Sequence, residues 1–424
     1  MKIAALNGFK DILPGETWLW RRVEETARDI FARFAFQEIR PPVLEKTELF
    51  RRSIGEATDI VEKEMYTFAD KGLSMRPEAT AGLLRAVIEH NLLAARPLRR
   101  LFTIGPMFRH ERPQMGRLRQ FHQLDVEVLG GAHPLLDAEL MAMGALLLTE
   151  LGLTASLEIN SLGCSNCRPV YREKLLRFIA SRRDKLCADC QRRSATNPLR
   201  VLDCKNPTCH AEVVDAPAIT EHLCPDCSAH FAAVEAGLTN LGVSYARNKF
   251  MVRGLDYYCR TTFEFLTTDL GAQAAVGAGG RYDGLIEQLG GPKGTPGIGF
   301  AMGLERLVLL LQQQEQTATA AEVDLYIAAL GSAAVSACLP LAQRLRERGL
   351  RVAIDHEGRG LKQQMKQADR LGTAATLIIG DDELASGQGV LRDMNSKEQR
   401  PVALDAGQIA DALASGRVVT KKSQ

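Results

Sequence analysis

The sequence predicts an α+β protein built in several parts, and three observations lead to this prediction. Residues 101–111 and 121–129 alternate polar and apolar side chains, as half-buried β-strands do. Eight of the ten cysteines fall between Cys164 and Cys227, which indicates an inserted, cysteine-rich and mostly helical domain. After a polar stretch at 313–321, strand-like and helix-like runs alternate to the C-terminus, as in a small α/β domain.

These changes along the chain set the expected domain boundaries. Residues 1–158 and 238–312 form one body, 159–237 the insert, 313–321 a linker and 322–424 the C-terminal domain. A chain of 424 residues is long enough for two or three domains. Its net charge of +2 is nearly neutral, so a polyanionic partner would have to meet local basic patches.

Composition also excludes several classes of protein. The N-terminus has no sustained apolar segment, so secretion is not expected. No apolar run reaches 18 residues, and the longest, 140–153, contains Glu150, so nothing is expected to span a membrane. We therefore expect a cytoplasmic protein, in which cysteines are free thiols or metal ligands rather than disulfides.

The first element is an amphipathic helix over 17–36. Its apolar residues follow a step of three or four, at Leu19, Val23, Ala27, Ile30 and Phe34. The sequence Arg40-Pro-Pro-Val then enters an extended segment, because proline disfavours helical backbone in the residue before it.

The two alternating strands form a predicted hairpin with one apolar and one polar face. The polar face carries Thr103, Gly105, Arg109, Glu111, Gln123, Asp125 and Glu127. A solvated sheet face would alternate in the same way. The connecting loop, 112–119, contains three arginines and is too cationic for a tight turn, so we interpret it as a mobile clamp for phosphate or carboxylate.

Three further motifs stand outside this hairpin. Glu78 and Thr80 precede an apolar helix, where the threonine is a candidate cap. The glycines of 297–303 lead into a helix with Arg306 near its start, a pattern also typical of close helix–sheet packing. Residues 250–260 gather Arg253, Asp256, Tyr257 and Tyr258, and two adjacent tyrosines suit the walls of a pocket for one small ring.

Together these motifs resemble those of class II aminoacyl-tRNA synthetases. The segment around Pro42 resembles the first class II motif, residues 108–123 the second and 297–307 the third. The run from Arg253 to Tyr258 resembles the signature of bacterial-type histidyl-tRNA synthetases, and the likeness covers nearly the whole chain. It implies a class II antiparallel sheet flanked by helices and a C-terminal anticodon-binding domain.

The resemblance also implies a role for each site residue. Arg109 and Arg253 would be catalytic, with Arg253 stabilising charge at the α-phosphate. The histidine-binding set would be Glu78, Thr80, Arg109, Gln123, Glu127, Arg253, Tyr257 and Tyr258. Within it, Glu127 and Tyr258 would receive the imidazole ring. The ATP-binding set would be Arg109, Glu111, Arg117 and Arg306.

The implied reaction joins L-histidine to tRNA(His). Histidine would attack the α-phosphate of ATP, supplied with Mg²⁺, and the adenylate would then pass histidine to the 3′ end of the tRNA. Arg112 and Arg119 would reach the tRNA, and the resemblance implies a homodimer. Basic residues on the C-terminal domain, which would read the anticodon, could equally be a solvated face.

The cysteines form four close pairs, 164/167, 187/190, 204/209 and 224/227. Such pairs suit one or two structural Zn²⁺ sites of four thiolates each, with His210, His222 and His230 as possible substitutes. Reduced, unliganded thiols are the alternative, and sequence order does not reveal which pairs share a metal.

Two other functions remain open at this point. One is a regulatory subunit of histidine biosynthesis that resembles the synthetase without charging tRNA. Such proteins typically lack the C-terminal domain and the Arg253 signature, and this chain has both. The other is a class II synthetase for proline or threonine, which the tyrosine pair and Glu127 disfavour.

Overall fold

The computed structural model describes residues 3–55, 58–204, 206–252, 255, 257–270, 275–314 and 323–417. They fall into two compact units, Met1–Gln316 and Thr317–Gln424. Most of the predicted linker 313–321 lies outside the described residues. The finer boundaries of the insert stay a prediction.

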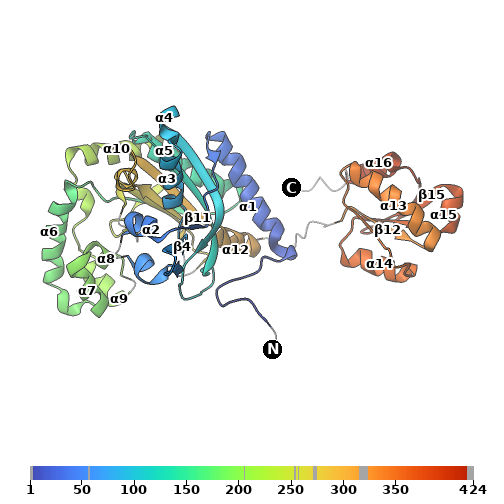
Figure 1. The fold of residues 1–424 in the computed structure, drawn as a ribbon, viewed down its shortest axis with the longest axis horizontal. Helices are drawn as coiled ribbons and strands as arrows, with labels where there is room; N and C mark the ends of the chain where they lie inside the picture. The colour runs from blue at the N-terminus through green and yellow to red at the C-terminus, as the bar shows by residue number, and fades with distance from the viewer. Residues whose placement is uncertain are drawn as a thin grey trace. The chain divides into compact units, whose positions relative to one another are not determined.

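An eight-stranded sheet is the centre of the first unit (Figure 1). Its inner strands run antiparallel, and its two outermost pairs are parallel. In spatial order the strands are β1 (Gln37–Glu38), β5 (Arg99–Phe108), β6 (Gln120–Leu129), β11 (Gly297–Gly303), β10 (Ala275–Arg281), β9 (Cys259–Leu266), β7 (Ser156–Ser161) and β8 (Tyr245–Arg247).

The predicted hairpin is formed by β5 and β6, in a register that pairs Thr103 with Asp125 and Leu101 with Glu127. The expectation for its connecting loop was wrong. Gln114 and Arg117 exchange backbone hydrogen bonds of 3.0 Å in each direction, so the tip is a tight turn. Gly116 takes a φ of 71°, which glycine adopts without steric cost.

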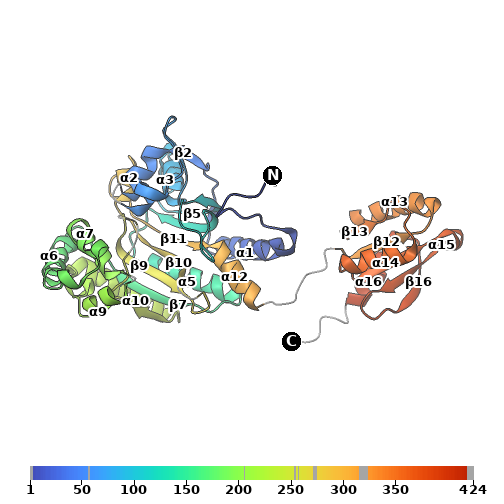
Figure 2. The same ribbon diagram turned by 90° about the horizontal axis from the view of Figure 1, so that it is seen from below.

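Four helices cover one face of the sheet (Figure 2). They are α1 (Pro14–Arg33), α5 (Leu135–Glu150), α10 (Pro225–Asn240) and α12 (Leu304–Gln314). The predicted first helix thus begins and ends three residues earlier than expected, because Pro14 is accommodated in its first turn. The long apolar run is α5, whose side chains lie in the core between the sheet and α10 rather than in a membrane.

The opposite face carries smaller elements near the β5 edge. Helix α3 (Thr80–Glu89) buries Leu83, Leu84 and Val87 against Leu101 and Leu129 of the sheet. Around it lie α2 (Thr47–Ile54), a π-helix (Ile60–Glu64), α4 (Leu92–Ala95), α11 (Leu285–Gln288) and a small sheet of β2 (Leu44–Lys46), β4 (Leu73–Met75) and β3 (Thr67–Phe68).

The cysteine-rich segment is mostly helical and leaves the sheet between β7 and α10. Its elements stand together at one end of the body in Figure 1. They are α6 (Cys167–Ala180), a 3₁₀ turn (Arg183–Lys185), α7 (Ala188–Thr196), α8 (Leu199–Leu202), α9 (Pro207–Val213) and a second 3₁₀ turn (Ile219–His222).

The second unit is the α/β domain expected at the C-terminus. Its sheet has the order β13 (Val352–Ile354), β12 (Leu325–Ala329), β14 (Ala375–Ile379), β15 (Gln388–Asp393) and β16 (Gln399–Ala403). Its helices are α13 (Ser332–Glu347), α14 (Leu361–Arg370), α15 (Asp381–Ser386) and α16 (Ala406–Arg417). The sequence reasoning did not predict α15 or α16.

A search of the described residues finds no helix long and apolar enough to cross a membrane.

Candidate active site

The candidate site is a cavity of about 360 Å³ over the middle of the large sheet. Strands β6, β9, β10 and β11 supply its floor, and the loop between β5 and β6, α3, α12 and the segment before β9 supply its walls. Within the size range of small-molecule sites, it brings together most of the residues that the sequence placed in one site.

One end of the cavity is built around the buried carboxyl group of Glu127. Tyr282 donates its hydroxyl proton to Glu127 Oε2 in a short hydrogen bond. The ring of Tyr257 lies between Tyr258 and Tyr282, with centroid distances of 4.6 Å and 5.8 Å. Burial raises the pKa of Glu127 to about 8, and the Tyr282 hydrogen bond only partly opposes this effect. This end can therefore hold a small polar ring beside a group that titrates near neutrality.

Glu78 caps the helix that begins at Thr80, so the expectation of a threonine cap was wrong. The Glu78 carboxylate accepts hydrogen bonds from the backbone N–H groups of Thr80 (2.8 Å) and Ala81 (2.9 Å). Those donors are otherwise unsatisfied at a helix N-terminus. Burial nevertheless raises the pKa of Glu78 above its ordinary value.

Two buried oxygens between these groups lack partners. Gln123 Oε1 and Asp125 Oδ2 accept no hydrogen bond from any described residue. Burial, followed by repulsion from Glu127 and Glu78, holds the pKa of Asp125 well above its ordinary value. Because buried acceptors are nearly always satisfied, this cluster is suited to a ligand that brings several N–H donors and a positive charge.

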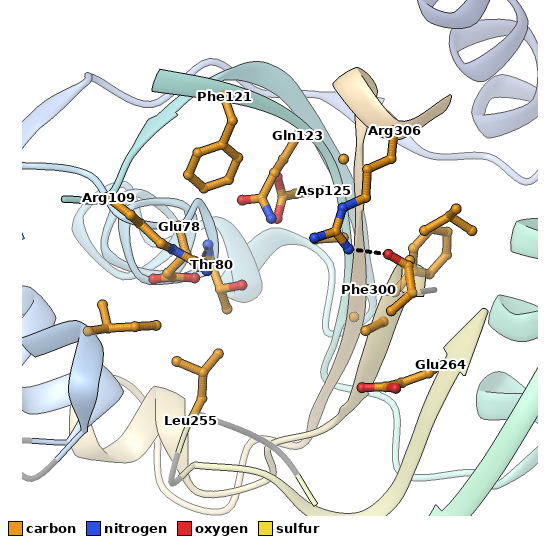
Figure 3. Close-up of a pocket in the computed structure, with 18 of the residues that line it drawn as sticks. Glu78, Thr80, Arg109, Phe121, Gln123, Asp125, Leu255, Glu264, Phe300 and Arg306 are labelled. Carbon is orange, nitrogen blue, oxygen red and sulfur yellow. Dashed lines mark hydrogen bonds between the residues drawn. The ribbon is translucent and has the colours of Figure 1, made fainter. Parts of the chain in front are cut away.

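Two arginines flank the cavity on opposite sides, as Figure 3 shows. Arg109 Nε donates to Pro77 O (2.8 Å), and its guanidinium lies 5.2 Å from the centroid of the Phe121 ring. Arg306 Nε donates to Gly116 O (3.3 Å) at the turn of the cationic loop, and Nη1 donates to Ala275 O. Both side chains are thus held on well-packed elements, as a clamp for an anion requires.

The cationic loop itself divides into parts that face the cavity and parts that do not. Arg117 pairs with Glu111, and both line the cavity. Arg112 is exposed and outside the cavity lining. Arg119 donates to Glu111 O (3.1 Å) and Asn7 O (3.3 Å), so it also braces the loop against the N-terminal segment.

The geometry adds residues that sequence reasoning did not assign. Tyr282 and Asp125 both reach the cavity, as do Glu264 and the insert's Asp203. Asp125 was recognisable from its place between Gln123 and Glu127, whereas Tyr282 approaches Glu127 only because β10 and β6 both flank β11. Arg253, predicted to be catalytic, lies outside the described residues.

The eight insert cysteines form two clusters, and the pairing is nested. Cys164, Cys167, Cys224 and Cys227 form the outer cluster, and Cys187, Cys190, Cys204 and Cys209 form the inner cluster. In each, the Sγ atoms lie within 4.8 Å of one another, and all eight thiols are free of disulfides. The suggested substitute ligands belong to neither cluster: His210 lies against Phe250, His222 beside Lys174, and His230 beside Asp137.

Comparison with known proteins identifies the family. A family model described as histidyl-tRNA synthetase matches residues 8–307, and one for an anticodon binding domain matches 324–413. A histidine–tRNA ligase of Desulfotalea psychrophila is 63% identical over 414 residues, which cover 98% of this chain and 96% of the relative. The chain belongs to the histidyl-tRNA synthetase family.

Other members of the family agree over the full length. A histidine–tRNA ligase of Trichlorobacter lovleyi is 54% identical and covers 98% of this chain. The crystal structure of the apo histidyl-tRNA synthetase of Staphylococcus aureus matches with a TM-score of 0.80 at 35% identity, over 96% of this chain and 99% of that one. The expected fold class is confirmed, and these matches, which include the C-terminal domain, favour a ligase over the regulatory subunit.

Proposed function

We propose that this synthetase-family chain is a histidine–tRNA ligase that uses the cavity to activate L-histidine with ATP. The amino acid is joined to AMP with release of pyrophosphate, and the histidyl group then passes to the 3′ end of tRNA(His). The observation that carries the proposal is the position of Glu127, buried beside Tyr282 in a cavity that Arg109 and Arg306 also line.

Glu127 is matched to imidazole through a shared proton. Its pKa of about 8 leaves it mostly protonated at pH 7, while free imidazole, with a pKa near 6.5, is mostly neutral. In the bound pair one proton lies between the two groups, as carboxylic acid and imidazole or as carboxylate and imidazolium. The other ring nitrogen is left for a tyrosine hydroxyl, and Tyr258 is the residue we assign to it. A ring without nitrogens would leave both protein groups unpaired.

The α-ammonium group would occupy the acidic cluster beside the ring. Gln123 Oε1 and Asp125 Oδ2 offer free acceptor sites there, and Glu78 and Thr80 border it. A cation relieves the repulsion among the three carboxyl groups of Glu78, Asp125 and Glu127. We therefore add Asp125 to the histidine-binding set.

Phosphates of ATP would lie between Arg109 and Arg306, which flank the cavity. Arg109 would contact the α-phosphate, Arg306 and Arg117 the distal phosphates, and Glu111 would hold Arg117 in place. The predicted role of Arg253 at the α-phosphate stays a prediction from the sequence. ATP arrives as its magnesium complex, and the carboxylates of Glu111 and Glu264 are ligands of the kind that Mg²⁺ prefers.

The test of the function is ATP–pyrophosphate exchange measured with each of the twenty amino acids and no tRNA. We expect exchange with histidine alone. Exchange with proline or threonine would move the assignment to another synthetase. Folded protein that binds histidine without exchange would support the regulatory alternative.

Arg306→Ala is expected to raise the ATP requirement more than the histidine requirement. Loss of one charge-assisted contact to phosphate costs about 1.5–3 kcal/mol, or roughly 10- to 100-fold in the KM for ATP. Arg306 is half-buried between the loop turn and β10, so the variant's melting temperature serves as the control for misfolding. Equal increases in both KM values would refute the assignment.

Tyr282→Phe is expected to weaken histidine binding about tenfold. The variant loses the hydrogen bond that lowers the pKa of Glu127, so this pKa rises further above 8 and less carboxylate is present at any pH below it. The KM for histidine, followed from pH 6 to 9, should begin its rise toward alkaline pH at a higher pH than in the wild type, because Glu127 keeps the shared proton to higher pH. A pH profile identical to that of the wild type would contradict this role.

The proposed surfaces for tRNA and for a partner subunit rest on exposed basic side chains and on the family resemblance. Arg112 and Arg119 would contact the acceptor end of the tRNA. Exposed basic residues of the second unit would contact the anticodon; among them are Arg344, Arg348, Lys362, Lys366 and Arg370. The family resemblance favours a homodimer formed around the segment that contains Pro42. A cytoplasmic location remains the expectation from composition.

Each cysteine cluster would hold one structural Zn²⁺. Tetrahedral zinc with Zn–S bonds of about 2.3 Å requires sulfur atoms about 3.8 Å apart. The separations are 3.6 Å for Cys164–Cys167, 3.8 Å for Cys164–Cys224 and 3.9 Å for Cys187–Cys204. Backbone N–H groups of Cys224 and Cys187 donate to Cys167 Sγ and Cys209 Sγ at 3.1 Å, which stabilises thiolates. Four thiolates complete the coordination, so the metal has no open position for catalysis.

A further inference from the structure

We propose that the outer cysteine cluster, when it holds zinc, fixes the Tyr258 wall of the histidine pocket, and that Arg168 makes the connection. This proposal rests on the proposed activation of histidine. It gives the insert a task in amino-acid recognition, separate from any contact with tRNA.

The cluster begins where the pairing of β7 with β9 ends. Leu162 N donates to Arg260 O (2.7 Å), and Arg260 N donates to Gly163 O (2.8 Å), directly before Cys164. Gly163 has a φ of 61°, and a Cβ placed on it would lie 2.7 Å from the Cβ of Cys167. The backbone at the start of β9, two residues after Tyr258, is therefore bonded to the residues directly before the cluster.

Arg168 connects the cluster to Tyr258 itself. It follows Cys167 in the first turn of α6, and its backbone N–H donates to Cys164 O (3.1 Å). Its guanidinium donates to two backbone carbonyls, those of Leu162 (3.2 Å) and Tyr258. The direction of this side chain depends on how α6 begins, and four metal–sulfur bonds would join that turn to the start of α10.

The position of Tyr258 in turn affects the packing of the side chains around the proposed imidazole site. Tyr258 is 7% exposed, and a Cβ on Gly280 would lie 2.9 Å from its Cδ1 atom. Its ring contacts Tyr257, which contacts Tyr282, the donor to Glu127. The two arginines assigned to ATP have separate supports, because Arg109 is held by Pro77 and Arg306 by Gly116 and Ala275. Loss of the outer metal should therefore impair histidine binding selectively.

The test compares Arg168→Gln and Cys227→Ser with Arg177→Gln, a matched arginine substitution on the exposed side of α6. Zinc per chain is counted after release by a chelator, and exchange gives the KM values for histidine and ATP. We expect two zinc ions in the wild type, in Arg168→Gln and in Arg177→Gln, and one in Cys227→Ser. The KM for histidine should rise about tenfold in Arg168→Gln and Cys227→Ser, and the KM for ATP should stay within about twofold. Arg177→Gln should match the wild type throughout.

Arg168→Gln tests the proposal even if Cys227→Ser does not fold, because the arginine variant keeps all eight thiols. Zinc-loaded Arg168→Gln with a wild-type KM for histidine would overturn the proposal, and so would equal increases in both KM values. Wild-type protein that contains no zinc would also overturn the proposal, because the outer cluster would then hold no metal. A zinc-loaded wild type that gives no exchange with histidine would instead count against the proposed function.

Discussion

Glu127→Gln is expected to lower kcat/KM for histidine in the exchange reaction by roughly 10²–10³-fold while leaving the KM for ATP nearly unchanged. Glutamine keeps the shape of the side chain and still accepts the hydrogen bond from Tyr282. It has neither the charge nor the exchangeable proton that a carboxyl group shares with imidazole. The loss therefore falls on the ring of the substrate and spares the phosphates.

The same substitution is expected to stabilise the protein at alkaline pH. The pKa of Glu127 is about 8 in the folded chain and 4.5 ordinarily, so between these values the folded state holds a proton that the unfolded state has released. Stability falls as pH rises through this window, and the full cost, a few kcal/mol, is present above pH 8. Glutamine does not titrate, so the variant escapes this cost.

Thermal unfolding without histidine, at pH 6 and pH 8.5, measures this effect. The melting temperature of Glu127→Gln should exceed that of the wild type by several degrees at pH 8.5 and by less at pH 6. A difference that is the same at both pH values would show that Glu127 does not titrate as proposed.

Gly299→Ala is expected to abolish detectable histidine-dependent exchange and to lower the melting temperature. Gly299 lies opposite Glu127 in the pairing of β11 with β6. A Cβ there would fall 1.7 Å from Glu127 Oε2 and 2.5 Å from the backbone oxygen of Val126. The methyl group can be accommodated only if Glu127 leaves its place beside Tyr282 and the two strands separate. Overpacking of this kind costs about 1–3 kcal/mol of stability, and more where backbone must move.

Gly284→Ala is the matched control for this prediction. Gly284 precedes α11 with a φ of −100°, and a Cβ on it would meet no heavy atom within 4 Å. We expect near wild-type stability and exchange. A Gly299→Ala protein with the wild-type KM for histidine would show that the cavity floor tolerates a side chain and that Glu127 can move without consequence.

Alternation and helical spacing predicted the parts of the fold that depend on near neighbours. The hairpin of β5 and β6 and the helix that contains Arg306 form in the predicted segments, although the first hairpin strand ends at Phe108 and leaves Arg109 and Glu111 in the loop. The tight turn at Gly116 was missed because the charge of the surrounding side chains does not restrict the backbone. Helix α15 is short, and its acidic first turn resembles a loop in the sequence.

The sequence patterns did not predict which residues from distant segments come into contact. Alternation put Glu127 on the polar face, yet only the strand order brings Tyr282 within reach of it. In the same way, cysteine spacing identified four pairs but not their nesting, since the outer cluster joins residues about sixty positions apart. Side-chain direction follows from local periodicity, whereas partners depend on topology.

The outer cluster also affects how far the inserted segment can vary in length and sequence. The chain leaves β7 shortly before Cys164 and rejoins the helices on the sheet at Cys224, where α10 begins, and the two sulfur atoms are 3.8 Å apart. Because the two ends of the segment between Cys164 and Cys224 lie side by side, this segment is a separate module. It can lengthen, shorten or be exchanged for another segment while the strands that carry the pocket keep their register.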